Sequence, residues 1–167
     1  SVGATENAML AASACKSPTR IINAAMEPEI IDLQNFLCAA GADVRGAGTS
    51  VIEIRGFEHS RGVEHTVIPD RIAAATYLCA AATAGGSVKL MHCMPQHLLT
   101  VISTLEESGC RIRTTQDTVE ITRNERLHAV REIRTMPYPG FPTDAQALLM
   151  SAMATAQGST VFVETIF

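Results

Sequence analysis

The chain has 167 residues, of which 47% are hydrophobic and 18% charged, and its formal net charge is −4. This composition is typical of a globular protein with one domain of average size or two small ones, and it lacks the basic excess that nucleic-acid binding needs. No apolar run is long enough for a transmembrane helix, so we expect no membrane partner, and the mild acidic balance argues against nucleic acid. The arrangement of the cysteines favours reduced thiols and so a cytoplasmic location.

The first part of the chain predicts a helix, a strand, a second helix and two further strands. Leu33 and Leu37 follow Ile30 at helical spacing, and Gly41 is suited to the left-handed conformation that ends a helix. Alternation of apolar and polar residues with period two indicates the strands. The expected elements are a helix at 5–14, a strand at 19–22, a helix at 28–40, and strands at 43–45 and 51–54.

The same order of elements recurs after Pro69, with Pro95 in the place of Pro28. A third copy begins near Pro142, continues through an Ala- and Met-rich helix, and stops in a strand at 159–163. The chain therefore contains an internal repeat. The expected elements of the second copy are a helix at 71–82, a strand at 87–90, a helix at 95–108, and strands at 111–113 and 118–121.

The first helix of each copy is rich in alanine. The helix that follows Asp70, its expected N-terminal cap, is apolar on nearly every side. A helix of that kind belongs inside a packed assembly rather than on a surface. The repeat thus predicts an α/β (α+β) fold of repeated βαβαββ units in which the Ala-rich helices are buried.

The sequence gives little indication of a metal site. The five cysteines include no Cys-x-x-Cys pair, so we expect reduced core thiols instead of disulfides or structural zinc. His92 and His97 have no acidic cluster beside them. The cysteines are Cys15, Cys38, Cys79, Cys93 and Cys110.

The arginines between 111 and 134 favour a solvated face over a nucleic-acid-binding patch, because no aromatic run accompanies them.

Three segments are the most distinctive: Ser-Val-Gly-Ala-Thr-Glu-Asn at 1–7, His-Thr-Val-Ile-Pro-Asp-Arg at 65–71, and Pro-Tyr-Pro-Gly-Phe-Pro-Thr-Asp at 137–144. Shorter segments at 27–30, 41–49 and 164–167 accompany them. In this order along the whole chain, they resemble the enolpyruvyl transferases, and among these the UDP-N-acetylglucosamine 1-carboxyvinyltransferases.

The resemblance implies that family's fold, an inside-out α/β barrel (alpha-beta prism) with two domains of three repeat units each. Residues 1–66 then correspond to the last repeat unit of one domain, and residues 67–167 to the first unit and a truncated second unit of the other. We therefore expect an internal fragment of a longer enzyme whose active site lies between the two domains. Its unpaired apolar faces favour non-native self-association.

The resemblance also implies a reaction, the transfer of enolpyruvate from phosphoenolpyruvate to the 3-hydroxyl of UDP-N-acetylglucosamine. This is the first committed step of peptidoglycan synthesis, and so of cell wall biogenesis, cell shape and cell division, and it needs no cofactor. By matching position, Asp144 is the acid/base aspartate beside that hydroxyl. The implied substrate-binding residues are Ser1, Val2 and Gly3 at the diphosphate, and Thr143 and Ile166 along the nucleotide sugar.

These residue types suit the implied chemistry, but each also has a plainer interpretation. A hydroxyl adds to an enol only if a group such as the Asp144 carboxylate accepts its proton, yet an aspartate here could also be an ordinary helix cap. Ser1 and Gly3 could present a hydroxyl and amides to a diphosphate at a helix N-terminus, or could belong to a plain loop.

Phosphoenolpyruvate requires several converging Lys or Arg side chains, and the family segments that supply them match no part of this chain. No cysteine here matches the family's proton-donating loop residue, so none is assigned that role. We therefore expect the chain alone to be inactive. Two alternatives stay open: another enolpyruvyl transferase, of the shikimate 3-phosphate type, and a non-catalytic repeat module that binds a nucleotide sugar or a protein partner.

Overall fold

The chain folds as two compact units, Ser1–Ile68 and Pro69–Phe167, in a computed structural model that describes residues 1–167. Each unit combines helices with a sheet, so the predicted α/β class is confirmed. None of the helices is both long enough and apolar enough to cross a membrane.

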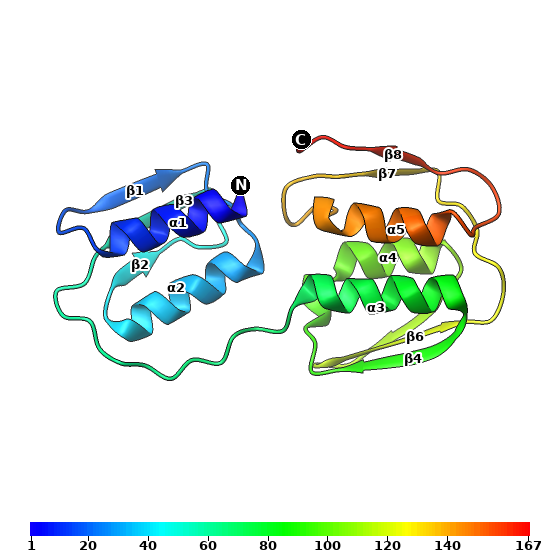
Figure 1. Ribbon diagram of the computed structural model, residues 1–167, viewed down its shortest axis with the longest axis horizontal. Helices are drawn as coiled ribbons and strands as arrows, with labels where there is room; N and C mark the ends of the chain where they lie inside the picture. Colours follow the sequence, from blue (N-terminus) through cyan, green and yellow to red (C-terminus); the bar gives the residue numbers. More distant parts are fainter. The chain divides into compact units, whose positions relative to one another are not determined.

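In the first unit, two helices cover one face of a three-stranded antiparallel sheet of order β1-β3-β2 (Figure 1). Met9, Ile30, Leu37 and Ile52 meet between these layers and are at most 3% exposed. The elements are α1 (Val2–Ser13), β1 (Thr19–Ile22), α2 (Pro28–Ala40), β2 (Asp43–Arg45) and β3 (Val51–Arg55).

The second unit begins with the same arrangement, since its first sheet is also antiparallel with order β4-β6-β5. The helix expected at 95–108 is interrupted, because Leu98 has φ −118° and ψ 6°, and a 3₁₀ turn precedes the α-helix. The elements are α3 (Arg71–Ala84), β4 (Gly86–Met91), η1 (Pro95–His97), α4 (Leu99–Glu107), β5 (Arg111–Thr114) and β6 (Thr118–Arg123).

The third copy adds a parallel pair of strands, β7 and β8, in which Ile133 lies opposite Phe162. Figure 1 shows α3, α4 and α5 between this pair and the β4-β6-β5 sheet. Leu78, Leu105 and Leu149 fill this layer and are completely buried. The elements are β7 (Glu132–Arg134), η2 (Thr143–Ala145), α5 (Gln146–Met153) and β8 (Val161–Val163).

The helix ends follow local sequence signals. Asp70 accepts hydrogen bonds from the amides of Ile72 and Ala73, at 2.8 and 3.1 Å, so its predicted capping role is confirmed. Gly41 ends α2 at φ +113°, as predicted. The helix expected from residue 5 begins instead at Val2, because Ser1 occupies its N-cap.

Helix α3 is less enclosed than its composition predicts. One face packs against α5 and the sheet, with Ala75, Leu78 and Ala82 at most 1% exposed. The opposite face carries a stripe of exposed residues at helical spacing, which we call the open stripe of α3. It consists of Ala73, Tyr77, Ala80 and Ala84.

Candidate functional site

Asp144 lies in the 3₁₀ turn η2, directly before α5, and its side chain is exposed. The residue at the cap position of η2 is Pro142, and neither η2 nor α5 begins with a side-chain capping bond. The interpretation of Asp144 as a helix cap is therefore wrong. The structure gives its carboxylate no partner within the chain, so the carboxylate is free to accept a proton or a hydrogen bond from a ligand.

The loop before η2 is fixed at both ends. The Met136 amide donates to the Phe141 carbonyl at 2.9 Å, and the Phe141 ring is 7% exposed. Midway along the loop, the Arg71 guanidinium lies 5.9 Å from the centre of the Tyr138 ring, a cation–π contact. These contacts hold the loop that leads to Asp144 against the second unit.

Glu164, which the sequence did not single out as a site residue, connects two of the predicted ones. Its carboxylate accepts hydrogen bonds from the Thr143 hydroxyl, at 2.8 Å, and from the Ile166 amide. Partial desolvation raises the pKa of Glu164, but hydrogen bonds from Ile166, Thr143 and Thr135 outweigh it and lower the pKa to about 2. Thr143 and Ile166 are therefore connected through Glu164, and Asp144 follows Thr143 in the same turn.

Ser1, Val2 and Gly3 lie in the first unit, at the N-terminus of α1. The Ser1 hydroxyl accepts a hydrogen bond from the Ala4 amide at 3.4 Å. The amides of Val2 and Gly3 belong to the first turn, where helix amides have no intrahelical acceptor. Gly3 is exposed, and a Cβ added to it would meet no atom within 4 Å. This end of α1 can approach an anion closely.

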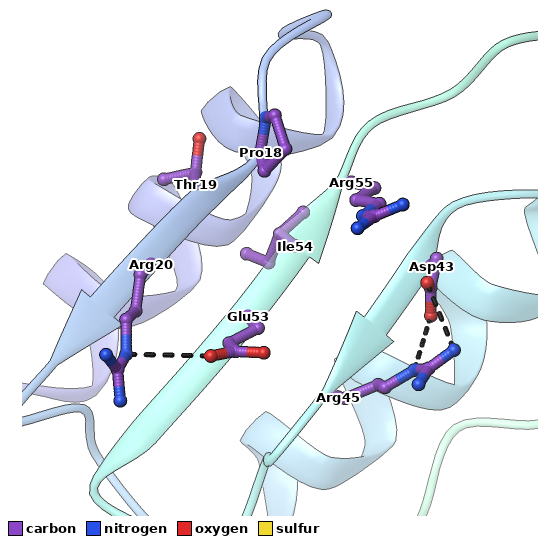
Figure 2. A pocket seen from close by; sticks show the side chains of 8 residues that line it. All are labelled: Pro18, Thr19, Arg20, Asp43, Arg45, Glu53, Ile54 and Arg55. Carbon is purple, nitrogen blue, oxygen red and sulfur yellow. Dashed lines mark hydrogen bonds and ion pairs between the residues drawn. The ribbon is translucent and has the colours of Figure 1, made fainter.

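A shallow hollow of about 370 Å³ lies over the outer face of the first sheet (Figure 2). Figure 2 shows Arg20 directed toward Glu53, at 3.6 Å, and Arg45 paired with Asp43 at 2.8 Å. None of the predicted site residues lines it. Because these pairs are largely exposed and their charges are satisfied by neighbours, the hollow is a solvated sheet face rather than a binding site.

Three of the five cysteines are buried core residues, as predicted, but Cys15 is exposed. Burial raises the pKa of Cys79 to about 12, and the nearby Cys110 adds to this shift. Burial also raises the pKa of Cys93 and of Cys110. These thiols are protonated at neutral pH, which suits packing rather than nucleophilic or acid–base chemistry. No group of three or more His, Cys, Asp or Glu side chains is placed to hold a metal ion.

The predicted resemblance is confirmed by comparison with known proteins. The model of the EPSP synthase (3-phosphoshikimate 1-carboxyvinyltransferase) family matches residues 1–167. UDP-N-acetylglucosamine 1-carboxyvinyltransferase 2 of Caldanaerobacter subterraneus subsp. tengcongensis is 51% identical over the whole chain, which covers 40% of that relative. UDP-N-acetylglucosamine 1-carboxyvinyltransferase 1 of Symbiobacterium thermophilum is 52% identical, and the chain covers 38% of it.

Solved structures show the same fold. The enolpyruvyl transferase NikO from Streptomyces tendae matches with a TM-score of 0.81 and 26% identity, over 98% of this chain and 40% of that one. EPSP synthase from Acinetobacter baumannii matches with a TM-score of 0.61 and 22% identity, over 97% of this chain and 38% of that one. The chain thus spans about 40% of the length of the relatives it matches. Since the family match extends from the first residue to the last, the chain belongs to the EPSP synthase (3-phosphoshikimate 1-carboxyvinyltransferase) family, the enolpyruvyl transferases.

Proposed function

We propose that this chain supplies nucleotide-sugar contacts and the acid/base aspartate in a longer enzyme that transfers enolpyruvate from phosphoenolpyruvate to the 3-hydroxyl of UDP-N-acetylglucosamine. The observation that carries the proposal is the exposed Asp144 carboxylate, which has no partner in the chain and lies on a fixed turn. The names of the relatives at 51% and 52% identity support this acceptor over shikimate 3-phosphate. In this proposal the reaction is cytoplasmic and begins peptidoglycan synthesis.

Asp144 acts in the proposed reaction as the group that takes the hydroxyl proton. The sugar oxygen forms a bond to the enol carbon, the double-bond electron pair moves to the methylene carbon, and that carbon takes a proton from a donor elsewhere in the enzyme. Loss of phosphate and of a proton from the resulting methyl group then restores the double bond. A positioned carboxylate contributes about 10²–10⁴-fold to such a step.

The remaining contacts are proposed for each unit separately. Ser1, Val2 and Gly3 hold the diphosphate with a hydroxyl and first-turn amides, while Thr143 and Ile166 line the nucleotide-sugar site. In this proposal residues 1–66 form the last repeat unit of one domain of the enzyme. Residues 67–167 form the first repeat unit and part of the second unit of the other domain.

The test is Asp144→Asn in the full-length protein that carries this chain. We expect kcat to fall about 10²–10⁴-fold while calorimetry still detects UDP-N-acetylglucosamine binding, because asparagine keeps the shape but cannot take the proton. Asp117→Asn is the matched control, since Asp117 is an exposed aspartate in the turn between β5 and β6. An Asp144→Asn enzyme with undiminished kcat contradicts the assignment.

The same calorimetry separates the two branches of the family. The unaltered full-length protein should give a binding signal with UDP-N-acetylglucosamine and none with shikimate 3-phosphate, and the reverse result would move it to the other branch. Residues 1–167 alone should release no phosphate from phosphoenolpyruvate, since that anion needs several converging cations from the rest of the enzyme.

A further inference from the structure

The carboxylate of Glu164 joins three segments of the second unit that are far apart in sequence. One oxygen, Oε1, accepts a hydrogen bond from the Thr135 hydroxyl at 2.8 Å, and the other, Oε2, accepts one from the Thr143 hydroxyl at 2.8 Å. The amides of Ile166 and Phe167 also donate to Oε1. The residue after β7, the start of η2 and the segment after β8 are therefore fastened to one side chain.

These hydrogen bonds restrict the motion of the three segments, because one carboxylate accepts all of them. An ionised carboxylate only accepts hydrogen bonds, so all four donors must point toward Glu164. Thr135 is 1% exposed, and its hydroxyl also accepts a hydrogen bond from the Thr165 amide at 2.9 Å. Turning that hydroxyl away would break its 2.8 Å bond to Glu164 and disturb the bond that it accepts from the Thr165 amide.

The direction of the Thr143 bond limits what Thr143 can offer a ligand. A hydroxyl has one proton to donate, and Thr143 gives it to Glu164. Its oxygen can then only accept a hydrogen bond, for example from an N–H or O–H group of a sugar derivative. Asp144 follows in the same 3₁₀ turn, so any displacement of Thr143 also displaces the Asp144 carboxylate.

We propose that Glu164 is a positioning residue for enolpyruvyl transfer, which holds Asp144 and Ile166 in place and fixes Thr143 as a hydrogen-bond acceptor toward the nucleotide sugar. Glu164 itself touches no reacting atom. This inference rests on the proposed function, because it requires Asp144 to be the group that takes the hydroxyl proton.

The test is Glu164→Gln in the full-length protein that carries this chain. Glutamine keeps one oxygen for the amides and Thr135, but it presents a donor to Thr143, whose own proton must then turn elsewhere. We expect kcat to fall about 10- to 100-fold, the effect of a misplacement of about 1 Å, and KM for the nucleotide sugar to rise, while KM for phosphoenolpyruvate stays constant. Glu132→Gln is the matched control, since that glutamate pairs with Arg134 at the surface.

A merely structural role would lower the unfolding temperature but leave kcat per folded molecule unchanged. If Glu164→Gln does not fold, Thr135→Ser and Thr135→Val give the answer, since serine keeps the hydroxyl donor to Glu164 and should retain most of kcat, whereas valine should not. Wild-type kcat for Glu164→Gln, or equal kcat for the two Thr135 variants, overturns the proposal. Full activity of Asp144→Asn would instead overturn the proposed function, so the two failures are distinguishable.

Discussion

At the scale of single residues, Gly3 is informative because nothing within the chain requires a glycine there. The position is exposed, and an added Cβ would meet open space. Glycine within a helix costs roughly 0.5–1 kcal/mol relative to alanine, so the structure alone would favour alanine. A ligand that approaches the backbone closely, as in the proposed diphosphate contact, would account for glycine at this position.

Gly3→Ala should consequently separate stability from binding. We expect the free energy of unfolding to stay constant or to rise by up to about 1 kcal/mol, because alanine is the better helix former. The affinity for UDP-N-acetylglucosamine should fall at least about 10-fold, which corresponds to roughly 1.4 kcal/mol of lost contact. Calorimetry and thermal unfolding measure the two effects. Ala11→Gly, at an exposed site on the same helix, should lower the free energy of unfolding and leave the affinity unchanged. Unchanged affinity in Gly3→Ala would remove Gly3 from the proposed site.

The sequence singled out some of the proposed site residues and not others. Asp144 and Gly3 stand out because they lie within contiguous matching segments. Glu164 and Thr135 were missed because their roles come from contacts between residues that are distant in the chain. No periodicity or motif reports that the Glu164 carboxylate reaches hydroxyls 21 and 29 residues away. Such contacts exist only after β7 and β8 have paired.

At the scale of elements, signals from neighbouring residues predicted helix ends correctly, whereas short strands and breaks within a helix were not predicted. Gly41 and Asp70 predicted their helix ends because capping depends on a few neighbouring residues. Strand β7 has one buried residue, Ile133, between two exposed charged residues, which is too short an alternation to identify as a strand. The break at Leu98 was also missed, because an apolar stripe looks the same whether or not its first turn is 3₁₀.

The contribution of the Asp70 capping bonds to helix α3 can be measured directly. Asp70→Ala should remove two capping bonds from the start of α3 and cost about 1 kcal/mol there. Hydrogen exchange of the Ile72 and Ala73 amides should then become about five times faster, because 1.4 kcal/mol corresponds to a factor of 10. Asp70→Asn retains a capping oxygen and should stay close to wild type. Equal exchange in all three proteins would show that the first turn is held by packing alone.

At the scale of the whole molecule, the first helix in each of the three copies of the repeat exposes a large apolar side chain. Each first helix buries one face and leaves the opposite one exposed, with Leu10 at 50%, Tyr77 at 63% and Met150 at 47%. Small alanines flank these residues, as in the open stripe of α3. Helices with small and apolar residues on both faces are suited to close packing on two sides. The relatives are more than twice as long as this chain, so they contain further residues that can supply such packing.

The 167-residue chain produced alone should therefore self-associate through these helices. Burying the exposed half of Leu10 or Met150 contributes roughly 0.8–1.5 kcal/mol each, so several such contacts must act together to hold copies together. Light scattering across a concentration series should show a mass that rises with concentration. Tyr77→Lys, which places a charge in the open stripe of α3, should shift this series toward the monomer. Ser103→Lys adds the same charge at an exposed site on α4 and should leave the association unchanged. A constant monomeric mass for the unaltered chain would mean that the exposed stripes are tolerated in water and need no partner helix.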